Sequence, residues 1–116
     1  MLDSDALARL AFDAMGDKQA TDLVILDLRP ITTMTDFFVI GTADNSRQLR
    51  AVADAVETRL RVDGRVKPTA TEGEPDSGWL LIDYGPLMVH VFETERRAFY
   101  DLESLWGEAP LVARMA

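Results

Sequence analysis

The chain of 116 residues has no cysteine and a single histidine. The lack of cysteine excludes a disulfide, a thiolate zinc site and a cysteine nucleophile. No apolar run approaches the roughly 18 residues of a membrane span, and the N-terminal segment lacks the basic start and apolar core of a secretory signal. We therefore expect a cytoplasmic protein that has no contact with membranes.

Basic residues are also scarce, with 12 Lys and Arg against 20 Asp and Glu and a net charge of −8. This balance argues against independent binding to a phosphate backbone, which requires a basic patch. It is compatible with a basic protein partner, such as a ribosomal or nucleoid protein, and equally with solubility alone. The length suits one domain spanning 1–116, and a homodimer is compatible with that size.

The spacing of apolar residues predicts a helix over residues 4–15, with Ser4 as its N-cap. A second helix has the clearest periodicity in the chain. It begins after a cap at Asn45 or Ser46 and ends before Gly64.

A third helix is predicted over residues 95–106, with Thr94 as its cap. Phe99 and Trp106 share one stripe of this helix, a pattern that is more often core than interface. The remaining residues, 108–116, are expected to form a loose tail after a core of about 21–107.

Short β-rich runs predict the strands. They lie at residues 23–28, about 37–42, 66–70, 79–84 and 87–92, and the last two form a hairpin. The strand–helix–strand order in the first half indicates a βαβ crossover. Together these elements predict an α/β fold, in which a mixed sheet of about five strands is flanked by helices.

The single histidine, His90, lies within an apolar run, on the same strand face as Met88 and Phe92. Asp83 lies across the hairpin from it. One histidine without ligands at a recognisable spacing does not make a metal site, and no serine lies in a nucleophile-elbow context. We interpret His90 as a structural or interaction residue.

Carboxylates near the strands leave an enzymatic alternative open. Asp27, Asp36 and Asp83 together would suit a nucleotidyltransferase-like, metal-dependent enzyme. The D-x-D pair and Gly-Ser turn typical of such enzymes are absent, as are the Gly-rich phosphate loops. A further alternative is an interaction module with some other partner.

Aromatic residues are concentrated in the last third of the chain, and Tyr and Trp are common anchors of binding surfaces. Among them are Trp79, Tyr84, Phe99, Tyr100 and Trp106.

Two segments carry a family resemblance. "TDFFVIGTADNSRQLRAVADAVE" and "GWLLIDYGPLMVHVFETERRAFYDLESLW" resemble the ribosomal silencing factor family, also called the Iojap family. The family motifs fall on Asp36 to Ala53 and on Gly78 to Trp106, and the likeness runs from about Thr21 to Trp106.

The resemblance implies an α/β fold with a mixed sheet, somewhat like a nucleotidyltransferase core but without known catalysis. We expect neither a metal nor a cofactor. It also implies a translational repressor that acts when nutrients are scarce. Such a protein binds the large ribosomal subunit at its protein number fourteen and blocks joining of the small subunit.

With this partner, the hairpin and the final helix are the expected docking surface. Asp83 and Glu103 would contact basic residues of the partner, and Glu103 is expected at an exposed helix position. Trp79 and Trp106 are either core or interface residues. The candidate partner-binding residues are Trp79, Asp83, Tyr84, His90, Tyr100, Glu103 and Trp106.

Overall fold

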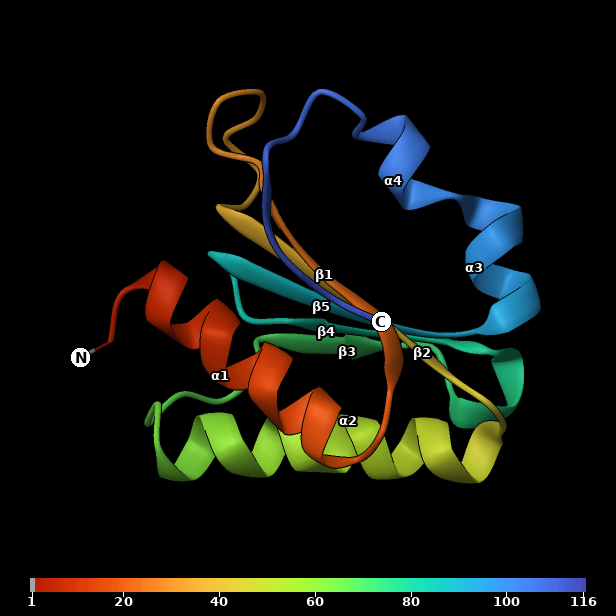
Figure 1. Ribbon diagram of the computed structural model, residues 1–116. Coiled ribbons are helices and arrows are strands. Elements are labelled where there is room, and N and C mark those ends of the chain that lie inside the picture. The colour runs from red at the N-terminus through yellow and green to blue at the C-terminus, as the bar shows by residue number, and fades with distance from the viewer. Residues whose placement is uncertain (1) are drawn as a thin grey trace.

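A computed structural model describes residues 2–116 as one sheet with helices packed on both of its faces (Figure 1). The elements follow one another in the order α1 (Ser4–Asp17), β1 (Thr21–Asp27), β2 (Phe37–Ala43), α2 (Ser46–Val62), β3 (Ala70–Glu72), the 3-10 turn η1 (Pro75–Ser77), β4 (Trp79–Asp83), β5 (Leu87–Glu93), α3 (Thr94–Tyr100), α4 (Leu102–Leu105) and β6 (Leu111–Met115). None of the helices within these residues combines the length and apolar character that a membrane span requires.

The sheet has six strands in the order β3-β4-β5-β2-β1-β6. β2 and β5 are parallel, and the other neighbouring pairs are antiparallel. The predicted α/β class with a mixed sheet is confirmed. The chain crosses from β2 through α2 to β3 at the edge of the sheet. The β4–β5 hairpin then lies between β3 and β2.

The expectation of a loose tail at 108–116 is wrong, because Leu111–Met115 forms the sixth strand against β1. β1 is buried on both faces along most of its length, so its outer backbone groups would otherwise lack hydrogen-bond partners. The ladder begins where the Asp27 N–H donates to the Pro110 carbonyl at 2.9 Å. The strand expected at 66–70 forms instead at Ala70–Glu72.

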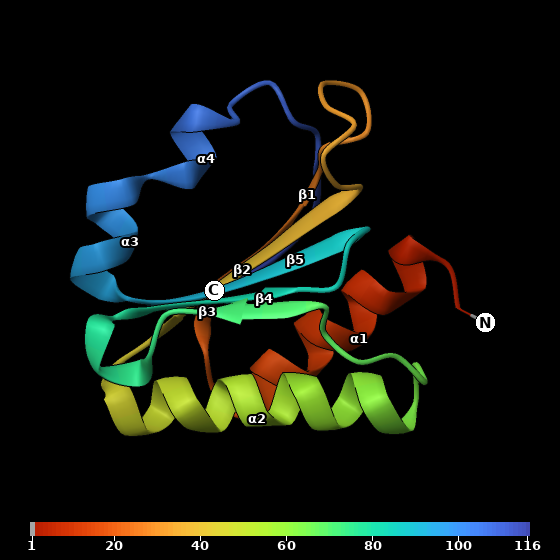
Figure 2. The ribbon, with the colours of Figure 1, turned by 180° about the vertical axis from the view of Figure 1, so that it is seen from behind.

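The two faces of the sheet carry different helices (Figures 1 and 2). α1 and α2 cover one face, while α3 and α4 lie over the other. Close approach of α1 to the sheet depends on Gly41 in β2, since a Cβ there would lie 2.5 Å from the Met15 methyl group. The main core lies under α1 and α2, and a second core lies under α3 and α4.

Side-chain caps determine where the first two helices begin. α1 is capped by Asp3, whose carboxylate accepts from the Ala6 N–H, and not by Ser4 as expected. α2 is capped by Asn45, which accepts from the Gln48 N–H at 2.8 Å. The Gln48 side-chain oxygen accepts from the N–H of Asp44. In a capping box this returning bond goes to the N-cap residue itself, and here it goes to the residue before the cap.

The single helix expected over 95–106 is divided in two at Asp101, which has φ 46° and lies in the left-handed region. Aspartate tolerates this conformation better than most residues, since its short polar side chain bonds locally. α3 begins at Thr94 after a Glu93 cap. The break turns α4 relative to α3, so the stripe predicted to join Phe99 to Trp106 is interrupted.

Candidate partner-binding face

The face of the sheet under α3 and α4 holds a small second core, and the candidate tryptophans lie at its border. Trp79 and Trp106 are half-buried and pack against it, and Trp106 meets Phe38 edge-on with ring centroids 5.8 Å apart. Each tryptophan therefore contributes to the core and retains an exposed part. The fully buried members of this core are Val24, Leu26, Leu28, Phe38, Ile40 and Phe92.

His90 lies inside this second core. Its Nδ1 accepts a hydrogen bond from the Trp79 Nε1–H at 3.2 Å, which places the ring proton of the neutral imidazole on Nε2. That Nε2 is buried and has no partner among the described residues. Burial lowers the pKa of His90 to about 3, so the ring is neutral at ordinary pH. The side chain is enclosed by aromatic rings, and no partner surface reaches it in this arrangement.

Tyr84 is also buried, but on the opposite face of the sheet, in the core beneath α1 and α2. Burial, and secondarily the charge of Glu57, raises the pKa of its hydroxyl well above the ordinary value. The structure therefore separates Tyr84 from the other candidates. Strand alternation contained this information, because Tyr84 shares its face with Leu80 and Ile82.

Asp83 is half-exposed at the end of β4, where it closes the hairpin turn. Its Oδ1 accepts from the Gly85 N–H at 2.7 Å, and its carbonyl accepts from the N–H of Thr69. This carboxylate already has a structural role, although its half-exposed position leaves it within reach of a partner.

Glu103 is not the free surface acid that its helix position predicts. It forms an ion pair with Arg97 at 2.9 Å, and the Arg97 side chain is only 11% exposed. Arg97 also donates to the Thr42 hydroxyl at 2.8 Å and to the Asp22 carbonyl. This arginine therefore fastens α3 and α4 to the ends of β1 and β2, and Glu103 balances its charge.

The exposed apolar residues of this face were not all predicted. Tyr100 is 41% exposed, and its neighbours Phe99 and Leu105 are 75% and 72% exposed. Phe99 was expected in the core, and Leu105 was not singled out. Their exposure follows from the break at Asp101, which a stripe drawn through a continuous helix cannot show.

Net charge is distributed unevenly along the chain, and the segment that carries most of the candidate residues holds most of it. Residues 68–109 contain nine carboxylates and two arginines, for a net charge of −7 out of the total of −8. One of the two arginines is Arg97, which is already paired. The exposed aromatic residues therefore lie in a strongly acidic part of the molecule.

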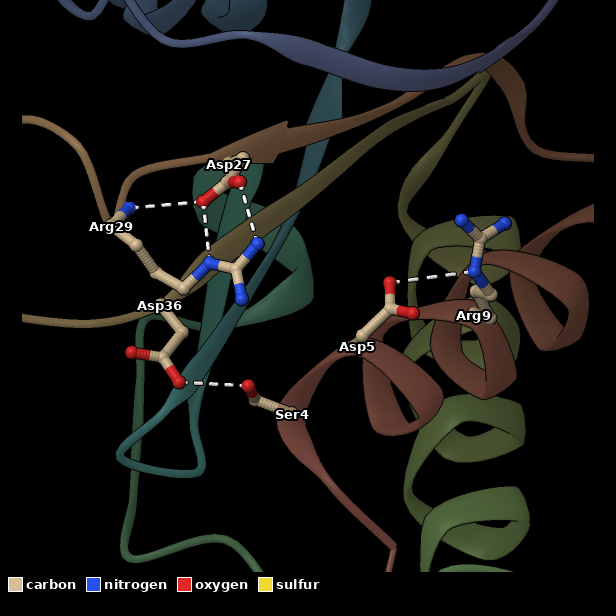
Figure 3. Close-up of polar contacts among 6 residues, drawn as sticks. All are labelled: Ser4, Asp5, Arg9, Asp27, Arg29 and Asp36. Carbon is tan, nitrogen blue, oxygen red and sulfur yellow. Dashed lines mark hydrogen bonds and ion pairs between the residues drawn. The ribbon is translucent and has the colours of Figure 1, made fainter.

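Two of the three carboxylates of the enzymatic alternative, Asp27 and Asp36, are directed toward separate partners (Figure 3). Asp27 binds the Arg29 guanidinium with both oxygens, and hydrogen bonding to this side chain lowers the pKa of its carboxyl group. Asp36 accepts from the Ser4 hydroxyl at 2.7 Å. Among residues 2–116, no group of three His, Cys, Asp or Glu side chains is placed to hold a metal ion.

Comparison with known proteins identifies the family. A family model described as "Ribosomal silencing factor during starvation" matches residues 2–115. The chain belongs to the ribosomal silencing factor family. Curated members from Halalkalibacterium halodurans and Bacillus subtilis are 36% and 33% identical to it, over 96% and 95% of this chain and 94% and 92% of their own length. Both bear the name "Ribosomal silencing factor RsfS".

Solved structures support the fold of this silencing factor. A crystal structure of a Chromobacterium violaceum protein superposes with a TM-score of 0.85 at 32% identity, covering 91% of this chain and 88% of the other. The family belongs to translation regulation, and its description names no enzymatic reaction. The expected likeness to a nucleotidyltransferase core stays a prediction.

Proposed function

We propose that this silencing factor is a translational repressor that binds the large ribosomal subunit at its protein number fourteen and blocks joining of the small subunit. The observation that carries the proposal is the match to the silencing factor family over residues 2–115. The net negative charge of residues 68–109 and the exposed aromatic residues of α3 support it, because they suit a basic protein partner.

The two components of this face have different physical roles in the proposal. Its net charge attracts a basic partner over a distance of about one Debye length and orients the encounter. The exposed Phe99, Tyr100 and Leu105 then lose contact with water on docking, which slows dissociation. Direct contact with nucleic acid is not the main mode of binding, since this face would repel phosphates.

The repression is steric. The molecule measures 32 × 31 × 25 Å, so a copy bound on the surface that faces the small subunit holds the two subunits apart. In this proposal the protein acts in the cytoplasm on free large subunits. A homodimer of the free protein, in which the same apolar residues cover one another, stays a prediction.

A subunit-joining assay tests this proposal. Purified protein, added to separated subunits before joining, should reduce the whole-ribosome fraction on a sucrose gradient and leave actively translating ribosomes intact. An acidic protein of similar size from another family serves as the control. An unchanged gradient at saturating protein would overturn the steric mechanism. Failure of purified subunit protein fourteen to bind the factor would overturn the choice of partner.

A further inference from the structure

A hollow of about 310 Å³ opens beside the exposed aromatic residues, where β3, β4 and α3 meet. This volume is at the low end for small-molecule sites, which range over about 300–1,000 Å³. It therefore suits one long side chain better than a whole ligand. The hollow is lined by Glu72, Gly73, Ser77, Trp79, Leu81 and Tyr100.

Two aromatic rings form part of the wall. The Trp79 and Tyr100 ring centroids lie 4.4 Å apart, with 45° between the planes. The Trp79 Nε1–H is donated to His90, and Phe92 stacks on the indole with ring centroids 4.9 Å apart. The half-buried indole therefore presents to the hollow the part of its ring that stays exposed, and no free donor. Phe99 meets Tyr100 edge-on at 5.1 Å and extends the apolar surface beyond the hollow.

Glu72 is the charged residue in the lining of the hollow. Glu74 and Asp76 follow it along the chain but lie in a neighbouring hollow, together with Arg47 and Arg50. Among the described residues, the ion pairs of this protein do not involve Glu72. An apolar side chain in the hollow would bury the Glu72 carboxylate without a partner, whereas a cationic side chain would neutralise its charge.

We propose that the hollow receives one arginine side chain of a basic protein partner. A guanidinium stacks on aromatic faces while it binds a carboxylate through its planar fork, and an ammonium does this less well. Trp79 and Tyr100 supply the stacking surface, and Glu72 supplies the counter-charge. This inference rests on the proposed function for the identity of the partner, but the chemistry of the hollow is testable without ribosomes.

The first test compares variants in co-sedimentation with large subunits. Glu72→Gln and Tyr100→Leu should each weaken binding by about fivefold, the size of one cation–π or ion-pair contact. Tyr100→Phe keeps the ring and should bind as the wild type does. Asp13→Asn makes the same charge change as Glu72→Gln at an exposed position of α1, on the opposite side of the sheet, and should also have no effect. Melting temperatures of all four variants establish that they are folded.

The second test uses the wild-type protein alone and the capped peptide Gly-Gly-Arg-Gly-Gly. Titration followed by ¹H–¹⁵N NMR should shift the indole signal of Trp79, while the same peptide with Gln in place of Arg should not. A Lys peptide should shift it less.

These tests separate the two proposals. If wild-type protein does not sediment with subunits and the Arg peptide shifts Trp79, the proposed function fails and the arginine site stands. If the wild type sediments but neither Glu72→Gln nor Tyr100→Leu weakens it, the arginine site is overturned. An Arg peptide that acts no differently from the Gln peptide would overturn it as well.

Discussion

The indole N–H of Trp79 and the Nδ1 of His90 are joined by a 3.2 Å hydrogen bond between β4 and β5. The bond fixes the imidazole in one tautomer and holds it between aromatic rings, with Phe38 edge-on at 4.5 Å. The one histidine of the chain is therefore a neutral packing residue that links the hairpin to the second core. It makes the stability of this core sensitive to acid.

Stability should fall with pH because of His90. Its pKa is about 3 in the folded protein and near 6.5 when the chain is unfolded. Between these values the unfolded state binds the extra proton, so the stabilisation is complete above about pH 6.5 and is lost progressively as the pH falls toward 3. Urea denaturation should show a loss of about 2 kcal/mol between pH 7 and pH 5.

The control for this loss is His90→Gln, whose side-chain oxygen can still accept from Trp79 but does not titrate. It should be less stable than the wild type at pH 7 and should have a much flatter profile from pH 7 to pH 5. Parallel profiles for the two proteins would show that His90 is not the group responsible.

Glu103→Arg should destabilise the protein, contrary to what an exposed helix position predicts. The change removes the counter-charge of Arg97 and places a second cation beside it. We expect a loss of about 1–3 kcal/mol in the free energy of unfolding. Glu108→Arg makes the same charge change at an exposed position and should melt close to the wild type. Equal melting temperatures for the two variants would mean that the Arg97 pair adds no stability.

Phe99 and Leu105 should matter for binding and not for folding. Replacing each by serine removes an apolar side chain that is already in water, so the free energy of unfolding should stay within about 0.5 kcal/mol of the wild type. Affinity for large subunits should fall by about tenfold or more if they are anchors. Val62→Ser, at an exposed apolar position on α2, is the matched control in co-sedimentation. Wild-type binding by both Phe99→Ser and Leu105→Ser would place the interface elsewhere.

Truncation after Pro110 should damage the whole sheet. Without β6, the outer edge of β1 loses its hydrogen-bond partners and the apolar strand becomes an open edge. Hydrogen exchange should accelerate along β1, and the urea midpoint should fall. Removal of Ala116 alone leaves β6 intact and should change neither. A truncated protein with wild-type exchange along β1 would show that β6 contributes no protection.

The sequence predicted the elements that depend on strong local patterns. The apolar stripe of α2 and the alternation along the β4–β5 hairpin both lead to the correct structures. β6 was missed because it is an edge strand, mostly exposed, and its partner β1 lies about 90 residues earlier. The break at Asp101 was missed because the left-handed conformation there is adopted by a residue other than glycine.

The candidate face was only partly predictable for a related reason. Aromatic clustering and the family motif point to the correct region, but burial depends on the side of the sheet from which each residue projects. Tyr84 and His90 proved to be buried on opposite faces, while Phe99 and Leu105 proved to be exposed. Strand alternation alone places Tyr84 on the face opposite His90. The exposure of Phe99 and Leu105 depends on the packing of α3 and α4, which a single sequence does not specify.

The strand order has a consequence for how the chain folds. β1 and β2 form an antiparallel hairpin in the first half of the chain, yet its two neighbours, β5 and β6, both come from the last third. During synthesis the β1–β2 hairpin therefore keeps its two apolar edges unpaired until β5 and β6 have been made, which requires almost the entire chain. Such long-range pairing slows folding and exposes edges to aggregation. The late C-terminal segment thus completes both sides of the nascent sheet.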